Sequence, residues 1–578
     1  MSRLLISSVT FAALTVVRAL HAQTELTPPA TAAPTAPGTT PAPGTTPAPG
    51  TTPAPGTTPA PGTAPAPGTT PAPGTAERGA PAPSESTPEP LATKAPPATT
   101  AAEAALIPVE REAEPGTAGV YQGVFFIRDR KDVLRLYVQG RAMIDFYSFY
   151  GEGVTHVNSL NPTFLLRKVR LELGGELFRK VQWFFGGDFG MGSTSLGANQ
   201  SVTVRAAPAD VYLNYKAHPL LNVEVGQFDL PFTAETRTSD KFLPFMERSI
   251  AVRVIGKGNA KDTGLMLWGN LDKRRVAYAV SLVQGDGMNR PNVDHRFDLV
   301  ARAYVRPFAG SNLPIRDVQL GASVRQGSRD QHLVGYDYPA MTTAGGYAFW
   351  KPTYGAATSA NNPQGQTHVI PSGSQTLAAA ELRVPTDSFD FTFEGVYGNE
   401  GTREAQDANL FQSLRFGTLT SYGYYAQVGW WPLGNAYVNG VPGDQGITSI
   451  DFSKPDKPPA SALQLLLKWE QLSANYEGNL RSGSSPSGIE GKIKVNTLSF
   501  GATYWLGKVL RLSANYGINW FPDSAPSSAT PGEAGAPVWS SEQRAQAPGN
   551  TLSPGVDDSA RDHAHVLHEV LCRAQVAF

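Results

Sequence analysis

Cysteine is nearly absent, since Cys572 is the only one in 578 residues. A single thiol excludes an internal disulfide framework and a cysteine-cluster metal site. Long apolar runs are lacking as well, because no stretch after residue 115 has the 18 consecutive apolar residues that a membrane-spanning helix requires. Neither sign of charge is in excess, with 48 Lys and Arg against 49 Asp and Glu. The composition therefore indicates neither a nucleic-acid partner nor an acidic tail.

Catalytic signatures are also missing. The chain contains no HExxH, no GxSxG and no phosphate-loop GxxxxGK. His563 and His565 lie two residues apart and share a strand face, but no acidic partner or nucleophile signature accompanies them. We expect no enzymatic activity, no metal site and no cofactor.

The first fifth of the chain differs from the rest. Residues 1–22 have the charged start, short apolar core and small-residue cleavage site of an export signal. Residues 23–115 include six tandem copies of TTPAPG between Thr39 and Gly74, one of them with Ala64 in place of Thr. Proline and glycine at this density prevent a packed core, so we expect a disordered, solvated spacer. Binding of this segment to the cell wall is the alternative.

From residue 133 onward the dominant period is two. In the stretch from Val133 to Tyr147, apolar residues such as Leu136, Val138 and Ile144 alternate with polar ones such as Arg141 and Asp145. Alternation with several charges per strand is typical of a barrel with lipid outside and water inside. An exported chain without a spanning helix can cross a membrane only as such a barrel. The pattern predicts sixteen strands: 133–150, 164–178, 180–190, 209–217, 221–228, 263–270, 274–284, 296–306, 317–326, 376–384, 388–398, 419–431, 462–472, 494–506, 509–520 and 563–578.

The connections favour a closed barrel. Very short turns follow several even-numbered strands, whereas long segments follow odd-numbered ones, notably 229–262, 327–375 and 521–562. This asymmetry is typical of outer-membrane barrels. One connection breaks the rule, because 432–460 is long where a short turn is expected. Either a strand is misassigned there or that turn carries an insertion.

The last strand ends on Phe578. A terminal Phe that closes an alternating strand resembles the signal by which the outer-membrane assembly machinery recognises its clients. The same alternation directs Cys572 outward, where it would serve as a small apolar residue.

The segment 229–262 is locally basic. From residue 237 to 261 it has six cations and two anions, Asp240 and Glu247. Pro231 and Pro244 prevent a regular ladder across it. Its charges could simply face water on a surface loop. Folded into the pore, the same segment would form a basic constriction that meets anions.

Several motifs resemble the phosphate- and polyphosphate-selective porins of the bacterial outer membrane. They are FLLRKVRLELGGELF (164–178), QWFFGGDFG (182–190), DVYLNYK (210–216) and VEVGQFDLPFTAETRTSDKFLPFMERS (223–249). The resemblance covers roughly residues 120–578 and implies a sixteen-stranded, trimeric barrel with loops folded into its channel. It also implies a track of arginine and lysine side chains that draws phosphate toward a narrow basic site.

The candidate anion-binding residues come from the loop and from the wall. On the loop they are Arg237, Lys241, Arg248 and Arg253. On the wall, strand parity directs Arg296, Arg302 and Arg306 inward from the eighth strand and Arg170 inward from the second. The inward faces carry both basic and acidic residues, so selectivity must come from local clustering near the constriction. For each arginine the alternative is an ion pair with a wall carboxylate.

These observations predict a passive outer-membrane porin (residues 116–578) that lets small anions diffuse, with phosphate or polyphosphate as the expected solute. The alternative is a general or sugar-selective porin of the same architecture. Expected partners are small anions, outer-membrane lipid, the assembly machinery through Phe578 and two further copies in a homotrimer. We expect the spacer 23–115 to lie in the periplasm.

Overall fold

The computed structural model describes residues 117–121, 123–151, 162–190, 207–256, 261–271, 275–330, 338–350, 367–406, 415–440, 460–480, 489–521 and 566–578, with single positions or short pieces at 352, 409–411, 413, 450 and 452. The expected export signal (1–22), the spacer (23–115), His563 and His565 lie outside this part of the chain. Within it, no helix is long and apolar enough to cross a membrane.

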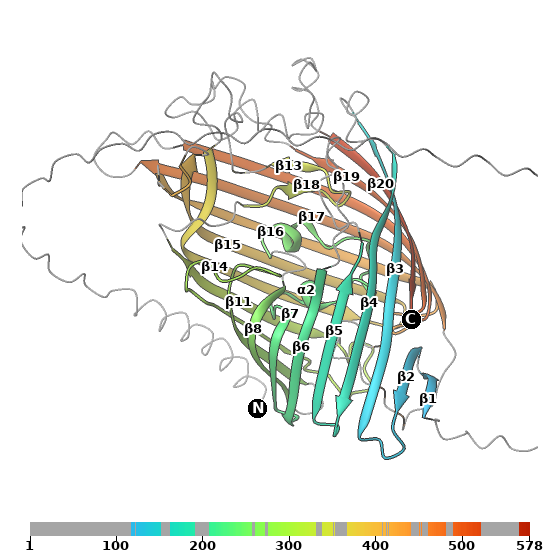
Figure 1. Cartoon of the computed structure of the whole chain (residues 1–578). Coiled ribbons are helices and arrows are strands. Elements are labelled where there is room, and N and C mark those ends of the chain that lie inside the picture. Colours follow the sequence, from blue (N-terminus) through green and yellow to red (C-terminus); the bar gives the residue numbers. More distant parts are fainter. Residues whose placement is uncertain are drawn as a thin grey trace, which may run out of the picture. The chain divides into compact units, whose positions relative to one another are not determined.

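Sixteen antiparallel strands form a closed barrel (Figure 1). They are β3 (Leu134–Tyr150), β4 (Thr163–Leu177), β5 (Val181–Asp188), β6 (Ala207–His218), β7 (Leu221–Asp229), β8 (Lys261–Leu271), β9 (Val276–Val283), β10 (Asp298–Val305), β11 (Gln319–Arg329), β14 (Thr367–Pro385), β15 (Phe389–Gln406), β16 (Arg415–Leu433), β17 (Ser461–Leu480), β18 (Ile489–Leu506), β19 (Leu510–Trp520) and β20 (Val566–Ala577). Each strand pairs with the next, and β20 pairs with β3 from His568–Tyr150 to Ala577–Arg141. The predicted sixteen-stranded barrel is confirmed.

The strand faces follow the predicted alternation. Large apolar side chains such as Leu265, Leu267, Val280 and Leu282 are exposed on the outer face. Charged and amide side chains on the opposite face are buried inside the barrel. A barrel leaves no unpaired sheet edge, which allows it to lie in lipid.

The C-terminal residue seals the junction between the last and first barrel strands. The backbone N–H of Gly140 donates to Phe578 O at 2.9 Å, and Phe578 N–H donates to Gly140 O at 3.1 Å. A Cβ on Gly140 would lie 2.4 Å from the Phe578 ring. Residue 140 must therefore be glycine for the aromatic ring to pack here.

Two short strands that the sequence pattern did not reveal precede the barrel. β1 (Ala118–Tyr121) pairs with β2 (Val124–Arg128), and β2 pairs with the first residues of β3. β2 therefore continues along the edge of β3 below the point where β20 ends. The hairpin lies beside the rim of short turns (Figure 1).

The short turns and long loops are distributed as expected. Residues 178–180, 219–220, 386–388 and 507–509 form tight connections on one rim, which we call the short-turn rim. The exception is confirmed as well: β16 ends at Leu433 and β17 begins at Ser461, so the long connection is an enlarged turn and not a misassigned strand.

The described part of this enlarged turn packs at two places. Ala436 lies in an apolar cluster with Trp431 and Trp505, against which Phe242 of the segment 230–260 packs. Further on, the Phe452 ring lies 4.9 Å from the ring of Phe126 in β2. The enlarged turn thus contacts both the interior of the barrel and the β1–β2 hairpin.

Candidate functional site

The segment between β7 and β8, residues 230–260, enters the barrel and crosses its interior. We call it the constriction loop. Its described part holds two short helices, α2 (Ala234–Arg237), capped by Thr233, and α3 (Ile250–Val254), capped by Ser249. Thr233 has a φ of 56°, which a branched residue adopts only where its surroundings enforce it. Side chains along the described part of this segment, such as Phe232, Asp240 and Ile250, are buried.

Backbone N–H groups of the loop donate to side chains from widely separated strands. Thr233 N donates to Ser323 Oγ of β11 at 3.2 Å, and Met246 N donates to Asn515 Oδ1 of β19 at 3.0 Å. Glu235 N and Ile250 N donate to the carboxylates Glu394 and Glu470. Because these partners lie on different sides of the barrel, the loop spans the interior and does not follow one wall.

Ion pairs fix the middle of the loop to β3 and β4. The Asp240 carboxylate accepts hydrogen bonds from Arg141 and Lys168. Lys241 Nζ lies 3.3 Å from Glu172, which also pairs with Arg141. Burial alone would raise the pKa of the Asp240 carboxyl, but the surrounding cations outweigh it and hold that pKa well below its usual value.

A second ion-pair group lies at Glu247. Its carboxylate accepts from Arg167 of β4 and Arg573 of β20 at 3.1 and 3.0 Å. Burial would raise the pKa of Glu247, but these two guanidinium groups hold it at about 2. We call the pairs at Asp240, Lys241 and Glu247 the charged junction.

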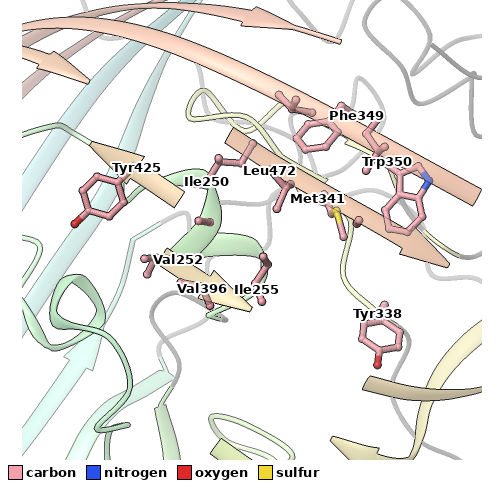
Figure 2. Packing of buried hydrophobic residues seen from close by; sticks show 14 of the residues in the cluster. Ile250, Val252, Ile255, Tyr338, Met341, Phe349, Trp350, Val396, Tyr425 and Leu472 are labelled. Atoms are coloured by element: carbon pink, nitrogen blue, oxygen red, sulfur yellow. The ribbon is translucent and has the colours of Figure 1, made fainter. Parts of the chain in front are cut away.

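The far end of the loop packs by apolar contacts instead. Figure 2 shows Ile250 and Val252 of α3 and the following Ile255 beside Leu472 of the wall and residues from a second inward segment, 338–350. That segment contains the hairpin β12 (Met341–Thr342) and β13 (Ala348–Trp350). Trp350 is fully buried. We call this packing the apolar cluster, and it fills an interior that the sequence pattern alone suggested would be wet.

Two cavities lie on either side of the constriction loop. The larger, of about 400 Å³, lies next to α3 and towards the long-loop rim. Five cations and five carboxylates line it: Arg253, Lys261, Arg290, Arg325, Arg329, Asp262, Asp286, Asp294, Asp330 and Glu400. The smaller, of about 90 Å³, lies towards the short-turn rim and is lined by residues that include Thr238, Phe242 and Arg383.

Three of the four candidate cations on the loop bond to backbone carbonyls. Arg237 donates to Asp229 O at 2.6 Å, and Arg248 donates to Glu235 O and Thr238 O. Arg253 donates to Arg248 O and to the carbonyls of Thr342 and Thr343 in the second inward segment. The fourth, Lys241, pairs with Glu172.

The candidate cations on the wall are mostly paired with wall groups. Arg302 makes two hydrogen bonds to Glu381, at 2.9 and 2.7 Å. Arg170 lies 2.7 Å from Asp188, and Arg306 donates to Gln319.

Arg296 requires a correction. The strand expected over 296–306 begins only at Asp298, so Arg296 lies in the preceding loop and is exposed. Alternation placed Arg296 on an inward strand face, but the strand pairing begins only two residues later.

Sequence parity missed Arg167. A register shift opposite Met143 and Ile144 inserts one extra residue into β4, so Arg167 and Lys168 are both buried inside the barrel although they are neighbours in the chain. A bulge of this kind breaks the period of two. No feature of the local sequence predicts this bulge.

Arg511 of β19 was also missed as a site residue. It is 1% exposed and donates to the carbonyls of Asp240, Pro244 and Phe245. Its position in an alternating strand could have shown that it points inward. Its contact with a loop some 270 residues away could not be found from the sequence.

Comparison with known proteins gives a consistent result. Residues 137–332 match the family described as phosphate-selective porin O and P. Porin O of Pseudomonas aeruginosa is 21% identical over 391 residues, which cover 65% of this chain and 81% of that protein. These matches confirm the family resemblance and identify a channel, as expected, and not an enzyme.

Solved structures similar to this chain include an outer-membrane protein, a porin and an outer-membrane channel. OmpT of Vibrio cholerae is 9% identical and covers 78% of this chain and 100% of its own, with a TM-score of 0.40. An anion-selective porin from Comamonas acidovorans is 10% identical and covers 77% and 100%, with a TM-score of 0.37. The DcaP channel of Acinetobacter baumannii is 11% identical and covers 78% and 99%, with a TM-score of 0.39.

Proposed function

We propose that this chain, a passive outer-membrane porin of which residues 137–332 match the phosphate-selective porin O and P family, prefers small anions and takes phosphate as its main solute. The relative named Porin O is only 21% identical to this chain, so it gives weak support for phosphate as the solute. The stronger support comes from the charges at the constriction loop.

Cations predominate where the loop meets the wall. Among the charged residues of 230–256 and the wall charges that hydrogen-bond or ion-pair with this segment, ten cations face six carboxylates. The wall cations are Arg141, Arg167, Lys168, Arg383, Arg511 and Arg573, and the wall carboxylates are Glu172, Glu394 and Glu470. In a narrow passage between low-dielectric walls, such an excess raises the local concentration of anions.

Arginine that bonds to carbonyl oxygens keeps its charge without contacting a carboxylate. Within the described part of the chain, the hydrogen bonds of Arg253 and Arg511 go to neutral oxygens. At an effective dielectric constant of about 20, a cation 4 Å from an anion contributes roughly 4 kcal/mol. Two or three converging guanidinium groups would suffice for selectivity, and their forked donors fit phosphate better than chloride.

The alternative is a general or sugar-selective porin. The larger cavity supports it, because its lining has as many carboxylates as cations. Under this alternative the constriction would set the size limit and the channel would show little preference between chloride and phosphate.

The deciding experiment uses purified protein in planar bilayers. Under a KCl gradient, an anion-preferring channel gives a zero-current potential of the sign set by chloride, and added phosphate then reduces the chloride conductance. Arg248→Ala should shift the potential towards cation preference, whereas Arg316→Ala, in the turn after β10, should not. A cation-selective wild-type channel, or one without any phosphate effect, would leave only the general porin.

Further parts of the proposal concern partners and placement. We propose that Phe578 presents the closing strand to the assembly machinery, that three copies associate in the membrane, and that residues 23–115 lie in the periplasm, either as a spacer or in contact with the cell wall. Sedimentation in detergent tests the trimer, and binding of the isolated segment 23–115 to peptidoglycan tests the cell-wall contact.

A further inference from the structure

We propose that Arg511 is a positioning residue that holds the constriction loop in place across the barrel, and that conductance depends on this contact. The inference concerns where the loop lies, and it holds whichever solute the channel prefers.

The loop needs donors for its carbonyl groups. Between α2 and α3 the backbone follows neither a helix nor a strand, and irregular backbone at membrane depth persists only where other groups satisfy it. Arg511 Nη1 donates to Asp240 O at 3.1 Å, and Nη2 donates to Pro244 O and Phe245 O at 3.3 and 2.9 Å. One side chain therefore satisfies three carbonyls over six residues of loop.

The guanidinium group is itself fixed from other directions. Its Nε donates to Ser513 Oγ at 3.0 Å, and its carbon lies 5.1 Å from the centre of the Trp505 ring. Arginine has five donors in a rigid plane and no acceptor, which suits this arrangement. A lysine at this position would carry the same charge, but its single ammonium could not reach all three carbonyls.

Arg511 contacts the constriction loop at Asp240, which is also part of the charged junction. Its partner Asp240 is also the residue whose carboxylate is held by Arg141 of β3 and Lys168 of β4. The loop is thus held at Asp240 in two ways: β19 binds the backbone carbonyl, and β3 and β4 bind the side-chain carboxylate. Loss of the first contact would let the backbone around Asp240 and Lys241 shift from its position in the barrel.

Neighbouring residues assist but do not replace it. Arg573 donates to Met246 O and also makes two hydrogen bonds to Asp145, so its loss would disturb the wall as well. Thr503 Oγ1 donates to Pro244 O, and Gln575 Nε2 donates to Lys241 O. Arg511 is the contact that can be altered with the least damage to the barrel itself.

The test compares Arg511→Lys and Arg511→Met with wild type in full-length protein. We expect Arg511→Lys to increase the single-channel conductance by roughly twofold, with noisier open levels, while the zero-current potential stays near wild type because the charge remains. Arg511→Met should increase the conductance and also weaken anion preference. In both variants trypsin should cleave after Lys241 or Arg248, sites that the wild-type barrel protects. Arg415→Lys, which pairs with Glu404 on the wall, is the matched control and should behave as wild type.

Barrel integrity is read from the different gel migration of unheated samples relative to boiled ones. Folded Arg511→Lys and Arg511→Met barrels with wild-type conductance and a protected loop would overturn the proposal. An increase in Arg415→Lys equal to that in Arg511→Lys would also overturn it, since the effect would then be general to arginines inside the barrel. If the Arg511 variants do not fold, Thr503→Val combined with Gln575→Leu decides, because it removes two other wall donors to the carbonyls of the same loop segment, Pro244 O and Lys241 O. Raised conductance then supports the proposal, and wild-type conductance opposes it.

Discussion

Two parts of the constriction loop are held by different forces: the charged junction in its middle, called its charged end below, and the apolar cluster at α3, called its apolar end. At the charged junction, Asp240 and Glu247 pair with wall cations from β3, β4 and β20. At the apolar cluster, α3 packs against Leu472 and the segment 338–350 (Figure 2). Arg253 adds hydrogen bonds to the carbonyls of Thr342 and Thr343, but no carboxylate takes part in them. The charged end can respond to pH and to the loss of a single ion-pair partner, whereas the apolar end responds mainly to changes of shape and volume.

The largest effect should come from the apolar end. Trp350→Ala removes a fully buried indole and should lower the free energy of unfolding by about 4 kcal/mol, through lost burial and the cavity left behind. Guanidinium titration in detergent, followed by circular dichroism, measures the change. Trp430→Ala, at an exposed position on the outer face, is the control and should cost much less. Equal losses for the two variants would mean that the apolar cluster is not a packed unit.

At the charged end, Asp145→Asn should have the next largest effect. Asp145 is fully buried and accepts two hydrogen bonds from Arg573, at 2.7 and 2.6 Å. Removing its charge leaves a buried guanidinium without its main partner and should cost about 3 kcal/mol. The same titration tests it. If the unfolding free energy fell by less than an exposed ion pair contributes, water would have to reach Arg573 and replace the lost hydrogen bonds.

Acid should release the charged end and leave the apolar end in place. The pKa values of Asp240 and Glu247 are lowered in the folded protein, the latter to about 2. A carboxyl with a lowered pKa stabilises the fold above its unfolded value, near 4, and this contribution is lost as the pH falls towards 2. Conductance should therefore be constant from pH 7 to 5 and increase below pH 4. A constant conductance down to pH 2.5 would contradict this role of the junction.

The smallest effect is expected at an exposed pair on the short-turn rim. Arg316 and Asp387 lie 3.5 Å apart with side chains that are 36% and 69% exposed. Asp387→Asn should change the unfolding free energy by less than about 0.5 kcal/mol, because water screens such pairs. Asp387→Asn therefore serves as the baseline for Asp145→Asn. If both variants lowered the unfolding free energy equally, the buried and the exposed ion pairs would not differ in strength.

The contrast also explains which site residues could be predicted. The basic stretch 237–261 was identified because its charge departs from that of the chain as a whole. Arg167 was missed because a bulge changes the parity of β4, and Arg296 was placed in a strand because alternation cannot show where a ladder ends. The segment 338–350 carries no charge signal, so its packing against α3 was not anticipated.

The sequence by itself determined the barrel, its sixteen strands and its rims, since a period of two and the length of each connection are local properties. Only the tertiary structure decided what the inward arginines contact. Whether a guanidinium meets a carboxylate, as in Arg302, or a loop carbonyl, as in Arg511, depends on residues brought together across the barrel from positions far apart in the chain. That choice sets which charges remain available to an ion, and no local pattern encodes it.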